Sequence, residues 1–298
     1  MEIFRVDDHI HAIDHDLLAR PGVGVTYVVR GDDIALIETG TSLTVPATLA
    51  GLQELSILPE QVGHIICTHV HMDHAGGAGY LADALPRAQV HIHSMSIEHL
   101  VDPSRLIPSV RRAVGEAAWP LHGDILPIPA ERLSPSENLH LDLGQDVVLE
   151  GWYTPGHSPD HVAYWDRKTG GLFAGDSTSL FMERYNLLLP ITPVPTYNLA
   201  AHRNTFAMLR QADISRLYIT HYGPHDNVAD VLRIGEEKLD ELVEIVNSAL
   251  NRGDEDVPAI NARWVPYAED HPGYLIAQSW GEMSVAGMLR YEKKRRQQ

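Results

Sequence analysis

The chain has one cysteine among its 298 residues, and a single thiol can form neither an internal disulfide nor a thiolate metal cluster. No apolar run reaches the roughly 18 to 20 residues that a membrane-spanning helix needs. The start, MEIFRVDDHI, also lacks the basic and then apolar layout of a secretory signal. These absences predict a soluble cytoplasmic protein, and they restrict any metal site to imidazole and carboxylate ligands.

Basic residues are also scarce, since 23 lysines and arginines stand against 40 aspartates and glutamates, for a formal net charge of -17. Such a field repels phosphate backbones and anionic lipid surfaces, so we expect neither nucleic acid nor a membrane as a partner. Bound divalent cations would offset part of this charge. Histidine is abundant instead, with 18 residues, and its clustering is more informative than its number.

The sequence shows no repeat, low-complexity segment or clear linker, and its apolar share of 44% is enough for a real core. We therefore expect a single domain over 1–298, with a core at about 20–225 and a helical C-terminal appendage at about 226–298. Strands come in blocks in each half, beginning with a hairpin at 23–39, and helices follow them. This order predicts two sheets packed together with helices outside.

The longest expected helix, at 227–253, keeps its apolar residues on one face and can close at Gly253. A terminal helix is expected from Ser279, and its basic end complements the dipole of a helix C-terminus. These helices offer apolar surface either for a homodimer or for packing on their own domain, and the sequence leaves both roles open.

The stretch THVHMDHAGG at 68–77 places four metal-ligand residues within six positions: His69, His71, Asp73 and His74. The first two are two residues apart where the strand HIICT ends, so an extended backbone points them the same way. The other two follow a turn toward a helix, which predicts two adjacent metal positions. A mixed histidine and carboxylate set suits Zn, Fe or Mn. We attribute to Gly76 and Gly77 a close approach of the backbone to the ions.

Three later β-runs each end with a ligand-type residue, namely His157 in YTPGHSPDH, Asp176 in LFAGDS and His221 in YITHYGPH. Strand ends can hold side chains rigidly around one point, so we expect these residues to complete a dinuclear site. A histidine outside such a cluster is more often a surface or core residue. We expect His161 to be a hydrogen-bonding partner of the loop, and we assign no role to His202 or His225.

In this order, the motifs resemble the metallo-β-lactamase superfamily over about residues 23–225. The resemblance implies an α+β fold, an αββα sandwich of two packed mixed β-sheets with helices on the outer faces and the metal site on one rim. It implies two divalent ions, most simply Zn, with Fe or Mn as alternatives. The implied ligands are His69, His71 and His157 for one ion, Asp73, His74 and His221 for the other, and Asp176 as the bridge.

One position departs from this pattern. The chain reads LIETG with Glu38, where the family commonly has an aspartate that supports the histidine loop. The longer side chain is expected to reach the loop as an acceptor beside the ligands.

The resemblance implies hydrolysis, because two such ions lower the pKa of a shared water and stabilise the oxyanion formed on attack. Asp73 is the expected catalytic carboxylate, which orients the nucleophile or passes its proton to the leaving group. The compact lactonase and glyoxalase II-like branches are most similar, so we expect a small-molecule lactone, carboxylic ester or thioester. The apolar segment at 179–198 is the expected pocket wall, and Tyr197 and Tyr222 are candidate donors to a substrate carbonyl.

Other interpretations stay open. A phosphodiester or phosphotriester hydrolase would use the same ions, with Arg184 as the cation in the expected wall. A non-catalytic metal-binding or interaction protein would more often lack a ligand. The stretch DDHIHAIDHD resembles the metal motif of amidohydrolase barrels, but the blocks of strands oppose eight alternating units, so we expect His9 and His11 to be edge-strand residues. Cys67 is expected to be a small buried residue.

Overall fold

The computed structural model describes residues 1–116 and 118–297, which form two units. Unit 1 comprises Met1–Tyr153, Asp160–Gly175 and Ile214–Asp226. Unit 2 comprises Thr154–Pro159, Asp176–Asp213 and the chain from Asn227 onward. Unit 2 therefore contains the expected C-terminal helices together with two earlier segments, and the single domain over 1–298 stays a prediction.

Sheet A of unit 1 runs in the order β1-β2-β3-β4-β5-β6-β7. Its strands are β1 Glu2–Arg5, β2 Ile10–Asp14, β3 Val25–Arg30, β4 Ile34–Ile37, β5 Val62–Ile66, β6 Gln89–Ile92 and β7 Leu133–Pro135. The strands pair antiparallel from β1 to β4 and parallel from β4 to β7. Parallel neighbours need crossover connections. These connections contain the helices α1 Val45–Glu54, α2 Met72–Ala75, α3 Ala78–Ala84, α4 Ile97–Val101 and α5 Leu106–Val114.

Sheet B of unit 1 runs in the order β15-β14-β11-β10-β9-β8. Its strands are β8 His140–Asp142, β9 Val148–Tyr153, β10 Val162–Asp166, β11 Gly171–Phe173, β14 Arg216–Ile219 and β15 Gly223–His225. The pairs are antiparallel except for β11 and β14, which are parallel because the chain passes through unit 2 between them. Single turns of 3-10 helix in unit 1 lie at Leu17–Ala19, Ser42–Thr44, Pro59–Gln61, Ser94–Ser96, Trp119–Leu121 and Ala130–Arg132.

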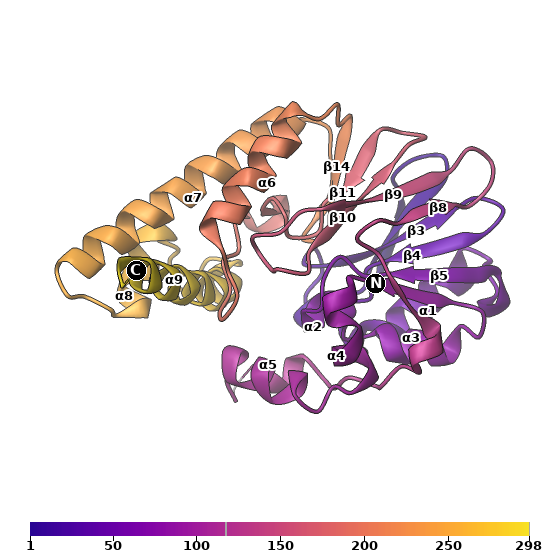
Figure 1. The fold of residues 1–298 in the computed structure, drawn as a ribbon, viewed down its shortest axis with the longest axis horizontal. Helices are drawn as coiled ribbons and strands as arrows, with labels where there is room; N and C mark the ends of the chain where they lie inside the picture. Colours follow the sequence, from indigo (N-terminus) through magenta and orange to yellow (C-terminus); the bar gives the residue numbers. More distant parts are fainter. Residues whose placement is uncertain (117, 298) are drawn as a thin grey trace. The chain divides into compact units, whose positions relative to one another are not determined.

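Alternating side chains of β4 show how sheet A is buried on both faces. Ala35 and Ile37 join an apolar cluster that also contains Phe173 of sheet B, whereas Leu36 joins a cluster that contains Leu81 of α3. Figure 1 shows α1, α3 and α4 on one side of sheet A and the strands of sheet B on the other. The expected α+β arrangement of two packed mixed sheets with helices is confirmed.

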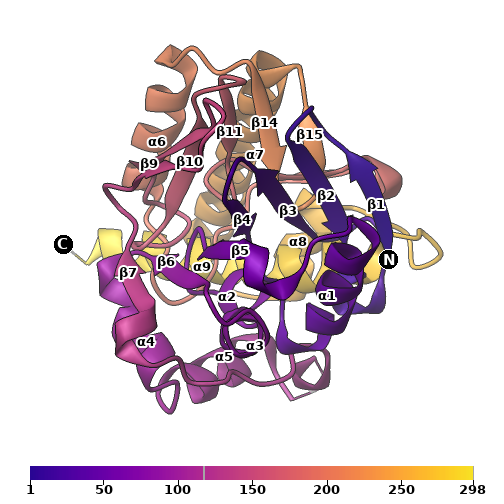
Figure 2. The ribbon, with the colours of Figure 1, turned by 90° about the vertical axis from the view of Figure 1, so that its right-hand side faces the viewer.

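The hairpin expected at 23–39 is confirmed as β3 and β4. The expectation that His9 and His11 lie on an edge strand is wrong. His11 belongs to β2, which pairs with β3 on one side and β1 on the other, so β1 is the edge (Figure 2). The short strand Glu2–Arg5 has little periodicity of its own and becomes a strand by pairing with β2.

Unit 2 is mainly helical. Its elements are α6 Leu199–Gln211, α7 Val228–Asn251, α8 Val257–Trp264, α9 Tyr274–Arg296, the paired strands β12 Leu180–Met182 and β13 Leu187–Leu189, and a 3-10 turn at Glu183–Tyr185. The long helix expected at 227–253 is confirmed as α7, and Asn227 caps it by accepting from the backbone of Asp230. The terminal helix α9 begins earlier than expected, at Tyr274, and α8 was not expected.

The expected pocket wall at 179–198 forms the β12-β13 hairpin in its first half. Tyr185, Leu187 and Leu189 are buried, so these side chains serve the core. Phe181 is half-buried, and Arg184 is exposed. The role of this segment as a pocket wall stays a prediction.

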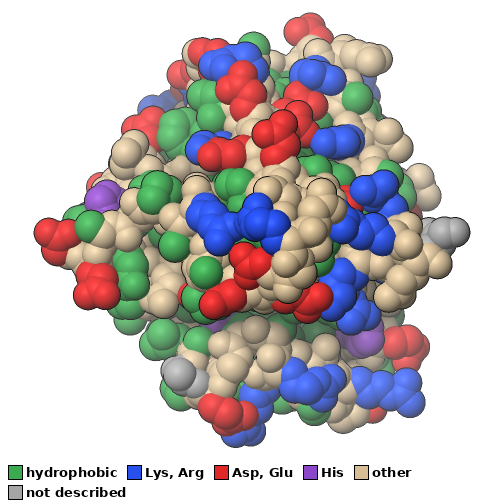
Figure 3. Space-filling model, turned by 90° about the vertical axis from the view of Figure 1, so that its left-hand side faces the viewer, with side chains coloured by type: hydrophobic (Ala, Val, Ile, Leu, Met, Phe, Trp, Pro, Cys, Tyr) green, Lys and Arg blue, Asp and Glu red, His purple; other side chains and the backbone are tan. Residues whose placement is uncertain are grey.

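The basic end of α9 is compensated locally. Lys293 pairs with Glu255 at 2.9 Å, and Arg295 pairs with Glu292 at 2.6 Å. The face drawn in Figure 3 likewise shows acidic and basic side chains interspersed. Within residues 1–116 and 118–297, none of the helices combines the length and apolarity that crossing a membrane requires.

A buried polar network joins the β1–β2 turn to the end of β10. Nε2 of His9 lies 2.9 Å from Oδ2 of Asp166, and Thr169 donates to the same oxygen at 2.6 Å. Asp166 is fully buried. Burial raises the pKa of its carboxyl, but the hydrogen bonds from His9 and Thr169 outweigh burial and hold the pKa below its ordinary value of 3.8.

We predict that Asp166→Asn lowers the free energy of unfolding by about 1–3 kcal/mol at neutral pH. Because the carboxyl has a lower pKa in the folded chain than in the unfolded one, its contribution is complete above pH 3.8 and is lost as the pH falls through the folded value. The difference between wild type and variant should therefore shrink below that pH. Urea unfolding of the metal-free protein over a pH series measures it. Asp8→Asn, which removes an exposed ion pair with Arg5, is the control and should change stability little. A pH-independent difference would contradict this assignment.

Candidate metal centre

The histidine loop begins where β5 ends. The backbone leaves the strand at Ile66, and α2 starts at Met72 and carries Asp73 and His74. Gly77 is required there because a Cβ would lie 2.6 Å from the carbonyl oxygen of Thr39. A Cβ on Gly76 would likewise lie 2.3 Å from the carbonyl oxygen of Met72. The nearest of these contacts are with backbone atoms, and the expectation that these glycines let the backbone approach the ions stays a prediction.

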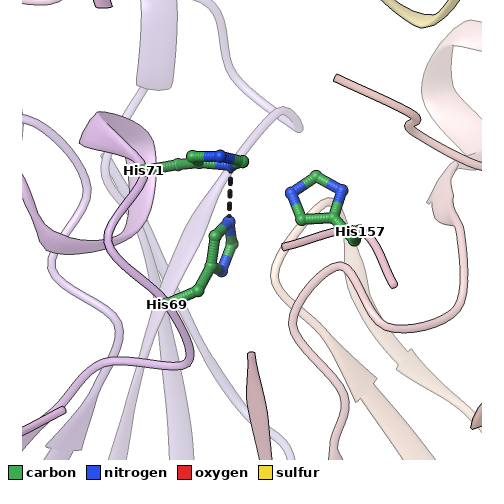
Figure 4. A group of neighbouring side chains, drawn as sticks. All are labelled: His69, His71 and His157. Atoms are coloured by element: carbon green, nitrogen blue, oxygen red, sulfur yellow. Dashed lines mark hydrogen bonds between the residues drawn. The ribbon is translucent and has the colours of Figure 1, made fainter. Parts of the chain in front are cut away.

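Two pairs of ring nitrogens meet in unit 1. Nε2 of His69 lies 2.8 Å from Nδ1 of His71, so the two rings converge as the strand geometry predicts (Figure 4). Nε2 of His74 lies 3.2 Å from Nε2 of His221. The rings of His69 and His74 are 4.1 Å apart between centroids, so the two pairs belong to one cluster.

Asp73 adds a carboxylate to the second pair. Its oxygens lie 3.6 Å from Nε2 of His221 and 3.9 Å from Nε2 of His74. Ligand atoms of these three residues all lie within 4.8 Å of one another, which is a spacing that could hold a metal ion. His74 and His221 are buried, whereas the Asp73 side chain is 24% exposed. The carboxylate therefore lies on the side that solvent reaches.

The outer nitrogens of these rings face acceptors. Nδ1 of His221 donates to the carbonyl oxygen of Val23 at 2.8 Å, and a carbonyl can only accept. Nδ1 of His74 lies 3.2 Å from a carboxylate oxygen of Glu38, which favours a proton on that nitrogen. In the neutral rings both Nε2 atoms therefore carry lone pairs, and these face each other at 3.2 Å. In this tautomer both lone pairs could bind one cation, so this donor set fits a metal ion.

Glu38 is the acceptor on which this arrangement rests. Its side chain is buried, and Oε1 accepts from Thr68 at 2.6 Å and from Thr220 at 3.2 Å. The hydroxyl of Thr68 donates its hydrogen to Glu38 in this hydrogen bond, so its oxygen can accept from Nδ1 of His69 at 3.0 Å. The expectation that Glu38 reaches the histidine loop is confirmed, and its carboxylate contacts three segments of the chain.

Unit 2 contains a second pair of expected ligands. Nε2 of His157 lies 3.4 Å from Oδ2 of Asp176, and both side chains are buried. Nδ1 of His157 donates to the carbonyl oxygen of Ile191 at 2.9 Å, so its Nε2 carries a lone pair like those of unit 1. The structure thus brings five expected ligands together in unit 1 and two in unit 2. One centre made of all seven stays a prediction.

Helix α6 supports the ligand-bearing loops of unit 2, and His202 is central to this support. Nε2 of His202 donates to the carbonyl oxygen of Ser177 at 3.2 Å, next to Asp176. Burial lowers the pKa of His202 to about 4, so the ring is neutral at physiological pH. Its Cα lies 2.3 Å from where a Cβ on Gly156 would stand, next to His157. The sequence assigned no role to His202, because its contacts with Gly156 and Ser177 come from distant segments, whereas its local contacts with Tyr197 and Phe206 do not point to the ligands.

Other residues singled out in the sequence have simpler environments. The ring of His161 stacks on that of His69 at 5.0 Å, and its role as a hydrogen-bonding partner of the loop stays a prediction. His225 contacts the carbonyl oxygen of Tyr222 at 3.0 Å. Tyr222 donates to Asp14 at 3.4 Å. Cys67 is buried as expected, and burial raises the pKa of its thiol, so it is unsuited to nucleophilic chemistry.

Comparison with known proteins identifies the class. The sequence model of the metallo-beta-lactamase superfamily matches residues 19–221, which is more than half of the chain. The chain therefore belongs to the metallo-β-lactamase superfamily. A superfamily protein from Sulfolobus tokodaii has a similar structure, with a TM-score of 0.72 and 20% identity over 94% of this chain and 97% of that chain. At this identity the likeness shows the fold alone.

Two curated relatives match part of the sequence. The uncharacterized protein YobT of Bacillus subtilis is 27% identical over 154 residues, covering 51% of this chain and 60% of that protein. A hydroxyacylglutathione hydrolase of a Synechococcus strain is 26% identical over 147 residues, covering 47% and 45%. The chain spans about half the length of these relatives. The residues matched by the superfamily model include all seven expected ligands.

We predict that Glu38→Ala lowers the affinity for a divalent ion about 10- to 100-fold, because Thr68 loses its acceptor and His74 loses the neighbouring carboxylate. Glu38→Gln, which keeps one acceptor oxygen, should lose less. Chelator competition with Zn²⁺ measures both affinities. Glu150→Ala is the matched control, since it removes a carboxylate that pairs with Arg167 on sheet B. An unchanged Zn²⁺ affinity in Glu38→Ala would exclude Glu38 from the support of the site.

Proposed function

We propose that this chain is a metal-dependent hydrolase that opens a lactone or cleaves a carboxylic ester or thioester. Membership of the metallo-β-lactamase superfamily supports hydrolytic chemistry. The observation that carries the proposal is the buried contact of His74 with His221, whose inner nitrogens face each other at 3.2 Å while their outer nitrogens face fixed acceptors. Together with the carboxylate of Asp73, these two inner nitrogens form a group whose spacing could hold a metal ion.

We propose two divalent ions, most simply Zn²⁺, because imidazole and carboxylate ligands suit it and a thiolate is lacking at the site. Asp73, His74 and His221 would hold one ion, His69, His71 and His157 the other, and Asp176 would bridge them. The inclusion of His157 and Asp176 is supported by the superfamily's ligand order and by the lone pair on Nε2 of His157. Fe or Mn are alternatives for the same donor set.

When bound, such ions supply Lewis acidity and lower the pKa of water toward neutrality. The chain's own contribution is to orient the reactants and to move a proton. Asp73 is the partly exposed carboxylate beside His74 and His221, so it can accept a proton from the attacking water. It can then deliver this proton to the leaving oxygen or sulfur. The buried histidines cannot do so while their Nε2 atoms are ligands.

Several observations favour an acyl substrate over a polyanion. The net charge of -17 disfavours polyanions. The partial likeness to hydroxyacylglutathione hydrolases supports an acyl group as the one cleaved. Half-buried Phe181 and Leu188 lie in the expected wall segment, which supports an apolar tail. A phosphoester hydrolase is the alternative, with exposed Arg184 as its cation.

We predict turnover of carbonyl substrates in a panel of short- and long-chain acyl-homoserine lactones, a simple lactone, a glutathione thioester and a phosphodiester. Activity should disappear after chelation and return on addition of Zn²⁺. Hydrolysis rates with each substrate, measured alongside metal content, test this expectation. Turnover of the phosphodiester alone would overturn the choice of a carbonyl substrate.

We predict that His71→Ala lowers kcat/KM by more than the 10- to 100-fold typical of residues that only support a ligand, because it removes a ligand. The melting temperature of the metal-free variant should stay close to that of the metal-free wild type. His140→Ala is the control, since this exposed histidine lies on sheet B away from the cluster. Full activity in His71→Ala would end the case for this ligand set.

A further inference from the structure

The histidine loop is held along its length by the segment that leads into β10. The contacts follow one another in antiparallel order, although the two segments extend strands of different sheets. The hydroxyl of Tyr164 donates to the carbonyl of Cys67 at 2.8 Å, and the amide of Val162 donates to the carbonyl of Thr68 at 2.8 Å. The ring of His161 stacks on that of His69, with 5.0 Å between centroids. The amide of Val70 donates to Asp160 at 2.9 Å. The last contact lies between the two expected ligands His69 and His71 in the chain.

Asp160 ends this series with a buried carboxylate, only 3% exposed. Its Oδ2 accepts from the amide of Val70 at 2.9 Å and also from the hydroxyl of Ser96 at 2.6 Å. Ser96 closes the 3-10 turn at Ser94–Ser96, directly before α4. One oxygen therefore joins the histidine loop, the start of a helix over sheet A and the entry to β10 of sheet B.

The position of the Val70 amide explains why this contact matters. Val70 lies between His69 and His71, whose nitrogens lie 2.8 Å apart and must stay close together to bind one ion. The orientation of the Val70 peptide determines how the two side chains leave the backbone. If its N–H lost the acceptor, the peptide would be free to rotate toward water, and the two imidazoles would separate.

We propose that Asp160 is a positioning residue of the metal centre, which holds His69 and His71 at chelating distance through the amide of Val70 and is itself held by Ser96. The inference rests on the proposed function only in taking His69 and His71 as metal ligands. The role belongs to the acceptor oxygen and not to the negative charge. An asparagine at this position should therefore fulfil the same role, because its amide oxygen can also accept two hydrogen bonds.

The experiment compares Asp160→Ala, Asp160→Asn and the wild type by chelator competition with Zn²⁺. Asp160→Ala should bind Zn²⁺ about 10- to 100-fold more weakly, and Asp160→Asn should keep the wild-type affinity. Asp166→Ala is the matched control, because Asp166 is an equally buried, hydrogen-bonded aspartate at the other end of β10. It should lower thermal stability and leave the Zn²⁺ affinity unchanged.

A second measurement needs no metal. Hydrogen exchange at the Val70 amide of the metal-free protein should become faster in Asp160→Ala and stay slow in Asp160→Asn. If Asp160→Ala does not fold, Ser96→Ala tests the same link, since it frees the carboxylate from its second donor. Like Asp160→Ala, that variant should bind Zn²⁺ more weakly and exchange the Val70 amide faster than the wild type. If neither quantity changes, the inference is overturned.

The outcomes separate the two proposals. A wild-type protein that binds no Zn²⁺ would overturn the metal centre and this inference together. If Asp160→Ala binds Zn²⁺ as tightly as the wild type, only the role of Asp160 is overturned. Equal losses in Asp160→Ala and Asp160→Asn would assign the effect to charge and would also overturn it.

Discussion

The acceptor role of Glu38 is the constraint on which the candidate centre depends. A carboxylate buried at the end of β4 is costly unless donors surround it. Here Thr68 and Thr220 donate to it, and the Nδ1 atom of His74 lies 3.2 Å away. Thr68 follows β5, His74 lies in α2 and Thr220 follows β14. The carboxylate thus links both sheets, and it also determines which nitrogen of each nearby histidine is left to bind a cation.

The remaining supports follow the same principle with backbone acceptors. Val23 accepts from His221, and Ile191 accepts from His157. Backbone carbonyls next to strands and hairpins move little, so each ring is held in one rotation and one tautomer. Each of these two imidazoles is thus held in place in advance, so a cation that bound it would cost little conformational entropy.

The two buried aspartates at the ends of β10 show how one strand serves stability and function separately. Asp166 is the last residue of the strand and accepts from His9 and Thr169, which anchors the β1–β2 turn. Asp160 precedes the strand and accepts from Val70 and Ser96, beside the histidine loop. Both carboxylates are buried and hydrogen-bonded, and their different partners give them different roles.

The sequence by itself determined the local chemistry. The spacing in THVHMDHAGG, the strand before it and the helix after it follow from residues that are close in the chain, so the convergence of His69 with His71 could be predicted. The hairpin β3-β4, the long helix α7 and the two-sheet architecture could be predicted for the same reason, because periodicity and turn residues are local signals.

Only the tertiary structure decided the supports. His202 on α6 packs against Gly156 and donates to the carbonyl of Ser177. Asp160 accepts from the amide of Val70, ninety residues away in the chain. Gly77 is required by the carbonyl of Thr39, and β2 is an inner strand because Glu2–Arg5 pairs outside it. Each of these depends on which distant backbone lies within a few ångströms, and a hydrogen bond of that range leaves no pattern in the order of residues.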